Sequence, residues 1–352
     1  MPSRSTFFAR NPRRSPARRL TTTLAAGLLL VLAGCGSDAT PEAQAQEKPL
    51  REVSVILDWT PNTNHSGLYL AAAKGYYAQA GLKVDLIEPG DTSGLQLLAA
   101  GQADFALSVA ESLVPARVKG IPVVSVAAVV EHNTSSLVSL ADKNITRPRD
   151  LVGHTYGGYE GALEEALIKS LVRCDGGDPE KVIFIPLAGD DFRIGLTENY
   201  YDTAWIFNAW DGIRLKDIDK LDINTINFLD HTDCIPDWYT PLIAAGENTV
   251  TQDPELVRSF LAATARGYAE AMTDPAAAVD ALMAAAPELD RDLLTRSADY
   301  LSTRYSETPA IWGLQSADTW SKFATFLKAH DLAPADFDVA AAWNGSFLPA
   351  AG

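Results

Sequence analysis

Apolar and polar residues alternate in short blocks along the chain, and these blocks predict strands and helices in alternation. Five short apolar runs have the length of buried strands: 53–57, 83–87, 105–109, 123–130 and 136–140. Blocks with helical character separate the first four of these runs: 66–76, 93–100 and 111–118. Strands and helices in alternation predict an α/β fold with mostly parallel sheets and helices on both faces.

A second α/β series and a helical tail follow the first series. The second series contains the strands 182–186, 203–207, 225–228 and 239–245 and the helices 163–172 and 191–196. The tail contains the helical blocks 254–272, 275–285, 290–301 and 316–330. The roughly 300 residues of these two series and the tail exceed one ordinary hydrophobic core, so we expect two lobes.

The N-terminal region has the pattern of an export signal. Residues 1–34 carry six arginines and no acidic residue, and the apolar run 24–32 is followed by Ala-Gly before Cys35. This run is shorter than the roughly 20 apolar residues of a membrane-spanning helix. The ending resembles the lipobox of bacterial lipoproteins, which implies a signal peptide over 1–34 and a lipidated Cys35. The alternative is an ordinary cleaved signal with an incidental cysteine.

The segment after Cys35 is predicted to be a tether. Residues 35–50 are mostly small and polar, which is typical of a flexible linker. The arginine pairs in the signal leave Sec and twin-arginine export both open. After residue 50 there is no second long apolar run, so we expect a soluble body held outside the cytoplasm by its lipid.

The charge of the chain excludes one class of partner. The sequence has 29 Lys and Arg against 45 Asp and Glu, a formal charge of −16. An acidic surface repels nucleic-acid phosphates, so we expect no nucleic-acid partner. It also repels anionic headgroups, so the membrane is expected to be contacted through the lipid anchor only.

Enzyme and metal signatures are absent from the sequence. We find no GxSxG, P-loop, HExxH or CxxC pattern, and no GxGxxG after a strand. We therefore expect no catalytic residue, metal or cofactor. Beyond Cys35 only Cys174 and Cys234 remain, and a disulfide between them is permitted outside the cytoplasm. Two separate buried thiols are the alternative, and both options stay open.

The loop 58–65 is the first candidate ligand contact. It leaves the carboxyl end of the first strand, where open α/β sheets bind their ligands. Trp59 offers a stacking face, Asn62 and Asn64 offer directional hydrogen bonds, and His65 offers an imidazole. This combination suits a flat, polar heterocycle. The alternative is a turn rich in Asn and Pro in which Trp59 fills the interior of the lobe.

The loop 156–161 is the second candidate, because it also follows a strand and precedes a helix. Glycines such as Gly158 allow a ligand or the opposite lobe to approach the backbone. Tyr159 and Glu160 follow them at the start of the helix. Glycine-rich turns before helices are common, and such a turn is the alternative.

The loop 207–212 is the third candidate and follows the strand 203–207. Trp210 and Asp211 place a carboxylate beside an aromatic ring. One carboxylate can pair with both the ring nitrogen and the exocyclic amine of an aminopyrimidine. A solvated aspartate at a turn is the alternative.

Several of these segments together carry a family likeness. The chain resembles the thiamine-pyrimidine branch of type II periplasmic binding proteins, which are solute-binding components of ABC importers. This branch includes formylaminopyrimidine-binding proteins and the thiamine pyrimidine synthases of fungi. The likeness covers about 51–330 and rests on these segments: LDWTPNTNHSGLYLAAAKGYYAQAGLKVDL, GQADFALSVAESLVPAR, GGYEGALEEAL and NAWDGI.

The resemblance implies two α/β lobes joined by crossover strands, with the ligand between them. Lobe one is expected over 51–140 and lobe two over 141–244, with 245–352 returning to lobe one and adding C-terminal helices. Family members more often have Glu where Asp211 stands. The residues that match the family's binding loops are Trp59, Asn62, Asn64, Tyr69, Ser108, Glu111, Tyr159, Glu160, Trp210 and Asp211.

The synthase members are enzymes of the same fold and form the rival interpretation. They use a Lys that holds pyridoxal phosphate and a His that is consumed. In the matching segment here, Ser108 stands at the Lys position and Ser112 at the His position. Without the Lys amine no Schiff base can form. The cysteine-rich motif of the synthases is also missing around Cys234.

The sequence therefore predicts a lipid-anchored, extracytoplasmic solute-binding protein of an ABC importer, acting as a monomer. The expected ligand is a thiamine pyrimidine precursor or a similar planar heterocycle, captured by hinge closure of the lobes. A riboflavin-like flavin, a sulfonate and a nitrile are the alternative ligands within the fold. The expected partners are an ABC permease and its ATPase.

Overall fold

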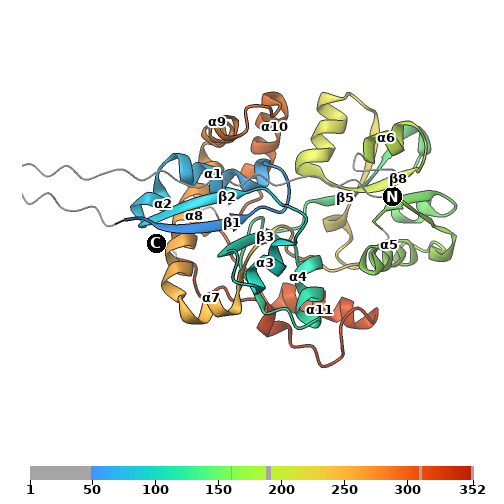
Figure 1. The fold of residues 1–352 in the computed structure, drawn as a ribbon. Coiled ribbons are helices and arrows are strands. Elements are labelled where there is room, and N and C mark those ends of the chain that lie inside the picture. Colours follow the sequence, from blue (N-terminus) through green and yellow to red (C-terminus); the bar gives the residue numbers. More distant parts are fainter. Residues whose placement is uncertain (1–48, 160, 188–191, 309–310, 350–352) are drawn as a thin grey trace, which may run out of the picture. The chain divides into compact units, whose positions relative to one another are not determined.

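The computed structural model describes residues 49–159, 161–187, 192–308 and 311–349 (Figure 1). The signal peptide, Cys35 and nearly all of the tether lie outside the described residues, as does Glu160. The described residues all belong to one unit of the chain, Lys48–Gly352. Among them, no helix combines the length and the apolarity needed to cross a membrane.

The first sheet has five strands in the order β2-β1-β3-β10-β4. β10 runs antiparallel to β3 and β4, and the other four strands share one direction. The sheet is therefore mixed, although all but one of its strands are parallel. Its strands are β1 (Arg51–Ile56), β2 (Leu82–Ile87), β3 (Phe105–Ser108), β4 (Val123–Ala128) and β10 (Leu242–Gly246).

The second sheet repeats this topology, in the order β7-β6-β8-β5-β9. Here β5 is the antiparallel strand, between β8 and β9. In each sheet the antiparallel strand is the one that arrives from the other sheet. The strands are β5 (Ser135–Leu140), β6 (Thr155–Gly158), β7 (Ile183–Pro186), β8 (Thr203–Phe207) and β9 (Ile223–Asn227).

Helices cover both faces of the first sheet, because its strands bury side chains on both sides. Val53 and Val55 of β1 pack with the helices α1 and α8, whereas Ile56 packs on the other face with α3 and α4. The helices are α1 (Ser66–Ala73), α2 (Tyr76–Gln79), α3 (Gly94–Ala99), α4 (Ala110–Val118), α5 (Ala162–Cys174), α6 (Phe192–Thr197), α7 (Glu247–Gln252), α8 (Pro254–Thr273), α9 (Pro275–Ala285), α10 (Arg291–Ser302) and α11 (Ala317–Ala329).

Two strands belong to a different sheet from the one expected for their lobe. The run 136–140, expected in lobe one, is β5 of the second sheet, and the run 239–245, assigned mainly to lobe two, contains β10 of the first sheet. Both strands are buried, although β5 contains three serines, and burial alone suits either sheet. Only the pairing partners decide the assignment. The predicted lobe boundaries themselves stay a prediction.

Two crossover segments connect the sheets, at 129–134 and 228–241. Asp237 joins them, because its Oδ2 pairs with His132 Nδ1 at 2.6 Å and its Oδ1 accepts from the Asn133 amide at 3.0 Å. The second crossover also carries Trp238, which stacks on Phe323 of α11 with ring centroids 5.7 Å apart. The crossovers are therefore tied to each other and to the helical tail.

The helix predicted over 66–76 is interrupted. α1 ends at Ala73 and α2 begins at Tyr76, because Gly75 has a φ of +68° that breaks the helical path. The sequence predicted Ser66 as the N-cap, but Ser66 is the first residue of α1, and His65 holds the N-cap position without a side-chain hydrogen bond. Asn62 caps the short 3₁₀ helix Thr63–His65 that precedes α1.

The helical tail follows the prediction closely. α9 has the predicted bounds, and α8, α10 and α11 differ from theirs by one residue at one or both ends. The short helix α7 and the π-helical turns Asn208–Gly212 and Arg214–Ile218 were not predicted. The first of these π-helical turns lies in the candidate ligand loop 207–212, which places the residues of that loop on a wide, irregular helical turn.

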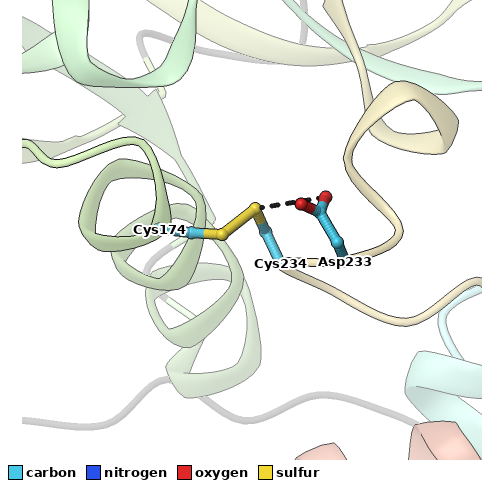
Figure 2. A group of neighbouring side chains, drawn as sticks. All are labelled: Cys174, Asp233 and Cys234. Carbon is cyan, nitrogen blue, oxygen red and sulfur yellow. Dashed lines mark hydrogen bonds between the residues drawn. A yellow bond between two sulfur atoms is a disulfide. The ribbon is translucent and has the colours of Figure 1, made fainter.

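A disulfide joins Cys174 and Cys234 and settles the question that the sequence left open (Figure 2). The two residues are 60 apart in the sequence and their Cα atoms are 5.6 Å apart. The bond connects the end of α5 to the crossover that follows β9. Asp233 lies beside it, but the two sulfurs are bonded to each other and so cannot serve as separate metal ligands.

Candidate functional site

The loop after β1 is held by its own side chains. Asn62 Oδ1 accepts from the Asn64 amide at 2.9 Å, and Asn62 Nδ2 donates to Thr60 O at 2.9 Å. His65 is fully buried, with Nδ1 accepting from the Asn62 amide at 3.3 Å and Nε2 bonded to Asp58 Oδ1 at 2.8 Å. In this structure Asn62 and His65 therefore position the loop, and their contact with a ligand stays a prediction.

Trp59 differs from its neighbours because 58% of its surface is exposed. It does not fill the interior of the lobe, which was the alternative that the sequence left open. Tyr159 is 79% exposed and directly follows β6. β1 and β6 occupy the same place in the two sheet orders, so an exposed ring follows the carboxyl end of the equivalent strand in each sheet.

A hydrogen-bond chain links the loops after β1 and β8. The Thr63 and Ser297 hydroxyl oxygens are 2.5 Å apart, and the Ser297 hydroxyl in turn donates to Ala209 O. Tyr305 OH donates to Thr63 O at 2.5 Å. Thus α10, which carries Ser297, connects two of the three predicted loops, although nothing in its sequence pattern pointed to this role.

Tyr69 and Trp210 lie against the same apolar cluster of α9 and α10, which includes Val279 and Leu294. Tyr69 is partly buried, and this burial raises the pKa of its hydroxyl, with a smaller contribution from Glu88 and Glu288. The structure therefore brings together one residue from each of two predicted segments. Trp210 is only half-buried there, so part of its ring is accessible.

Asp211 forms a hydrogen bond within its own loop. Its Oδ2 accepts from the Phe207 amide at 3.1 Å, which helps to hold the π-helical turn at the end of β8. Asn64, by contrast, uses its backbone: its carbonyl accepts from Tyr268 OH at 2.6 Å. Pairing of the Asp211 carboxylate with a ligand stays a prediction.

Ser108 and Glu111 lie at the carboxyl end of β3 and in the first turn of α4. Ser108 is buried at the end of the strand. Glu111 Oε2 is buried and has no hydrogen-bond partner of good geometry among the described residues, and the same holds for Trp238 Nε1 and Thr240 Oγ1. Burial raises the pKa of Glu111 to about 7, although Trp238 and Thr240 partly oppose this rise.

The glycines at the end of β6 make room for neighbouring side chains of the second sheet and of α5. A Cβ on Gly157 would lie 2.4 Å from the Tyr201 ring, and a Cβ on Gly158 would lie 2.4 Å from the Tyr156 ring and 2.6 Å from Glu164 Oε1. The approach of a ligand or of the opposite lobe, which the sequence suggested, stays a prediction. The approaching groups are Tyr156, Glu164 and Tyr201, so no ligand is needed to explain these glycines.

A pocket of about 400 Å³ opens beside the crossover between β4 and β5. Its wall includes the crossover residues 132–134, Ser135 at the start of β5, Asn208 after β8, Asn227 at the end of β9, and Arg304 and Glu307 after α10. Among the described residues of the three loops singled out from the sequence, only Asn208, in the last loop, lines this wall. The available signal was the polar run 131–136, which lies between two apolar strands.

The rim of this pocket carries a histidine with several acidic neighbours. His132 is bonded to Asp237, and its Nε2 lies 3.5 Å from Glu307 Oε1. The hydrogen bond to Asp237 is the largest cause that raises the pKa of His132, and burial opposes it. Glu131 and Glu307 add to the rise, so protonated His132 is favoured at this end of the crossover.

Comparison with proteins of known sequence gives relatives over most of the chain. The formylaminopyrimidine-binding protein of Halalkalibacterium halodurans is 30% identical over 312 residues, 86% of this chain and 91% of that protein. The 4-amino-5-hydroxymethyl-2-methylpyrimidine phosphate synthase of Legionella pneumophila is 26% identical over 84% of this chain and 92% of that protein. The riboflavin-binding protein RibY of Chloroflexus aurantiacus is 26% identical, covering 93% and 97%.

Comparison with solved structures confirms the predicted fold class. The periplasmic aliphatic sulphonate-binding protein SsuA of Escherichia coli matches with a TM-score of 0.63 at 15% identity, over 83% of this chain and 91% of that chain. The α/β fold with two sheets is therefore the periplasmic binding protein fold. A family model described as NMT1/THI5 like matches residues 62–278. The chain belongs to the NMT1/THI5-like family.

Proposed function

We propose that this chain is the extracytoplasmic solute-binding component of an ABC importer and that it captures a planar nitrogen heterocycle. The observation that carries the proposal is the pair of exposed rings, Trp59 and Tyr159, each after the carboxyl end of the equivalent strand in its sheet. Ligands of open α/β sheets bind at such strand ends. Exposed aromatic rings there offer flat apolar faces to a flat solute.

A thiamine pyrimidine precursor is the solute that we favour within this class. The formylaminopyrimidine-binding protein is the relative that supports it, at 30% identity. A carboxylate such as Asp211 or Glu111 can pair with the donor edge of an aminopyrimidine. A riboflavin-like flavin is the alternative, supported by the 26% identical riboflavin-binding relative.

The synthase alternative receives less support from the site. The side chain at the carboxyl end of β3 is Ser108, a hydroxyl that cannot form an imine with pyridoxal phosphate. The relatives named as synthases are the reason to test this alternative. Borohydride reduction after incubation with pyridoxal phosphate, followed by peptide mapping, separates the two functions. We expect no labelled lysine, and a lysine labelled near β3 or α4 would support the enzyme.

The proposed cycle requires partners and an anchor. We propose that Cys35 carries the lipid that holds the body at the membrane, and that an ABC permease with its ATPase receives the solute. Hinge closure at the two crossovers would enclose the ligand between the sheets. Such a motion would strain the hydrogen bonds of Asp237, which connect the two crossovers.

Identification of the solute tests the proposal directly. Protein purified from its native host is denatured, and the released small molecules are identified by mass spectrometry. In parallel, the thermal unfolding of the ligand-free protein is measured with a panel of pyrimidines, thiamine, flavins and sulfonates. We expect a planar heterocycle in the first measurement and stabilisation by the same compound in the second. Stabilisation by an alkanesulfonate alone would overturn the proposal.

A further inference from the structure

Ser297 of α10 occupies a buried position between two of the candidate ligand loops. Its hydroxyl donates its one proton to Ala209 O, in the turn after β8. The Thr63 hydroxyl, whose oxygen is 2.5 Å away in the loop after β1, must therefore donate to Ser297. Ser297 thus accepts a hydrogen bond from one loop and donates a hydrogen bond to the other.

The two loops joined by Ser297 belong to different sheets. The loop with Thr63 follows β1 of the first sheet, and the turn with Ala209 follows β8 of the second. α10 is part of the body around the first sheet, because its Leu301 packs in the same core cluster as Val55 of β1. Ser297 therefore makes a contact between the bodies of the two sheets that is separate from the two crossovers.

Apolar contacts surround this hydrogen bond. Ala209 is 2% exposed and packs in the core cluster of the first sheet, although its own segment follows a strand of the second. The next residue, Trp210, packs against Val279 of α9 and Leu294 of α10. Leu294 and Ser297 are three residues apart, so they lie on one face of α10. This face receives the turn after β8 through a hydrogen bond and an apolar surface.

A motion that separates the two sheets at the carboxyl ends of β1 and β8 must break this contact. Ser297 Oγ and Ala209 O would then be hydrated, so only a modest net free energy opposes the separation. A contact of this strength can form and break repeatedly, as the capture and release of a solute require. The same strand ends are the place where open α/β sheets bind their ligands.

We propose that Ser297 is a positioning residue that latches the turn after β8 onto α10 when the two sheets close on the solute. This inference rests on the proposed function, because it assigns part of that closure to one side chain. Ser297 is enclosed by Thr63 and Ala209. It acts on the solute through the positions of Trp210 and of the loop 58–65.

Ser297→Ala tests the latch, because it leaves Ala209 O without its donor in the closed form. We expect the variant to bind solute about five- to fiftyfold more weakly, through faster dissociation at an unchanged association rate. The urea midpoint of the solute-free variant should equal that of the wild type, because water replaces the contact in the open form. Ser302→Ala is the matched control, since the Ser302 hydroxyl donates to Asp299 O within α10, at 2.8 Å.

Three probes are titrated into the wild type and the variants by calorimetry, and dissociation is followed by stopped-flow tryptophan fluorescence. The probes are 4-amino-5-hydroxymethyl-2-methylpyrimidine, riboflavin and butanesulfonate. The first two are planar heterocycles and the third is not, so the wild type by itself tests the proposed function. Thr63→Val is a second variant, which removes the donor to Ser297 and keeps the bond to Ala209 O. It should weaken binding by a smaller factor than Ser297→Ala, and it replaces Ser297→Ala as the test if that variant does not fold.

The outcomes distinguish the latch from the proposed function. If a planar probe binds the wild type and Ser297→Ala equally tightly, the latch is overturned and the proposed function stands. A lower urea midpoint of solute-free Ser297→Ala also overturns the latch, because the hydroxyl would then stabilise the fold in every state. If only butanesulfonate binds and Ser297→Ala weakens it, the latch stands and the proposed function fails. If none of the three probes binds, both are overturned.

Discussion

At the scale of single residues, the predicted site divides into supporting and exposed side chains. Asn62 and His65 use their polar atoms within the loop, whereas Trp59 and Tyr159 turn large apolar surfaces to the outside. Residue type alone did not separate these two groups. Polar residues that bind a ligand and polar residues that cap a turn have the same chemistry. The contacts of the folded loop make the distinction.

The first prediction concerns the two exposed rings. Trp59→Ala and Tyr159→Ala should each weaken binding of the identified solute by roughly one to two decades, since stacking on an aromatic ring is worth about 1–3 kcal/mol. Neither change should lower the thermal midpoint much, because both rings are mostly exposed. Calorimetry and thermal unfolding of the variants measure the two effects.

Tyr200→Ala is the control for these variants. Tyr200 is 57% exposed and belongs to none of the predicted ligand loops, so its removal should leave affinity unchanged. Equal affinities of the wild type and both ring variants would show that the assignment of these rings to the ligand site is wrong, even though the family assignment would remain.

A second prediction at this scale concerns Asp175, which follows α5. Its carboxylate accepts from Arg147 Nε at 2.7 Å and from the Arg149 amide at 3.0 Å. The hydrogen bond from Arg147 is the main reason why the pKa of Asp175 falls from 3.8 to about 2 in the folded protein. A lowered folded pKa stabilises the protein fully above pH 4 and loses this effect as the pH falls toward 2.

Asp175→Asn isolates this effect from the other carboxylates. The difference in urea midpoint between wild type and variant should be largest near pH 7 and should shrink steadily between pH 4 and pH 2. Arg147 is half-exposed, so solvent screening keeps the difference small. A difference that keeps its size at pH 2.5 would contradict the assignment of the shift to this ion pair.

At the scale of elements, the contact between α1 and α8 depends on two glycines. A Cβ on Gly67 would lie 2.2 Å from the Tyr268 ring, and a Cβ on Gly267 would lie 2.0 Å from Gly67 O. The backbones of α1 and α8 are therefore in direct contact at these two glycines. Because α1 follows the loop 58–65, this contact also fixes the position of the end of that loop relative to α8.

The prediction at this scale is that Gly67→Ala destabilises the protein. The added methyl group must displace a buried ring that stacks on Trp312, so the expected loss is about 1–3 kcal/mol or more. Gly90→Ala is the control, because a Cβ there meets nothing within 4 Å and should change stability little. Urea unfolding compares the three proteins. A Gly67→Ala variant as stable as the Gly90→Ala variant would contradict the close packing.

Elements with one strong local signal were predicted well, and elements that depend on the surroundings were not. α9 was predicted with its bounds because Asp274 caps it and Pro275 begins it. The helix 66–76 was predicted as one piece, because the sequence does not show that Gly75 has a positive φ. The π-helical turn around Trp210 has no sequence signature, because it exists through contacts such as Ser297 to Ala209.

At the scale of the whole molecule, the two sheets share one topology, with an antiparallel strand received from the other sheet. This exchange makes the crossovers 129–134 and 228–241 the segments on which any motion between the sheets depends. The Cys174–Cys234 disulfide fastens α5 to the second of them. The helical tail is fastened there as well, through Trp238 and Phe323.

The prediction at this scale concerns attachment to the membrane. Cys35→Ser should release the protein from the membrane fraction into the soluble fraction, because the substituted residue can no longer carry a lipid. Fractionation of the producing cells, with a salt wash and an immunoblot, measures the distribution. Cys174→Ser together with Cys234→Ser is a suitable control and should leave attachment unchanged. A Cys35→Ser protein that stays with the membrane after the wash would refute the lipoprotein assignment.

The sequence by itself determined the alternation of strands and helices, the family, and the loops at the carboxyl ends of β1, β6 and β8. These features depend on local patterns, in which period, capping and turn residues act over a few positions. The tertiary structure alone decided which sheet receives β5 and β10, that Cys174 meets Cys234, and that Asn133 and Ser135 face a pocket. The reason is physical: these features join residues far apart in the chain, and a buried apolar strand or a polar crossover carries no local mark of its partner.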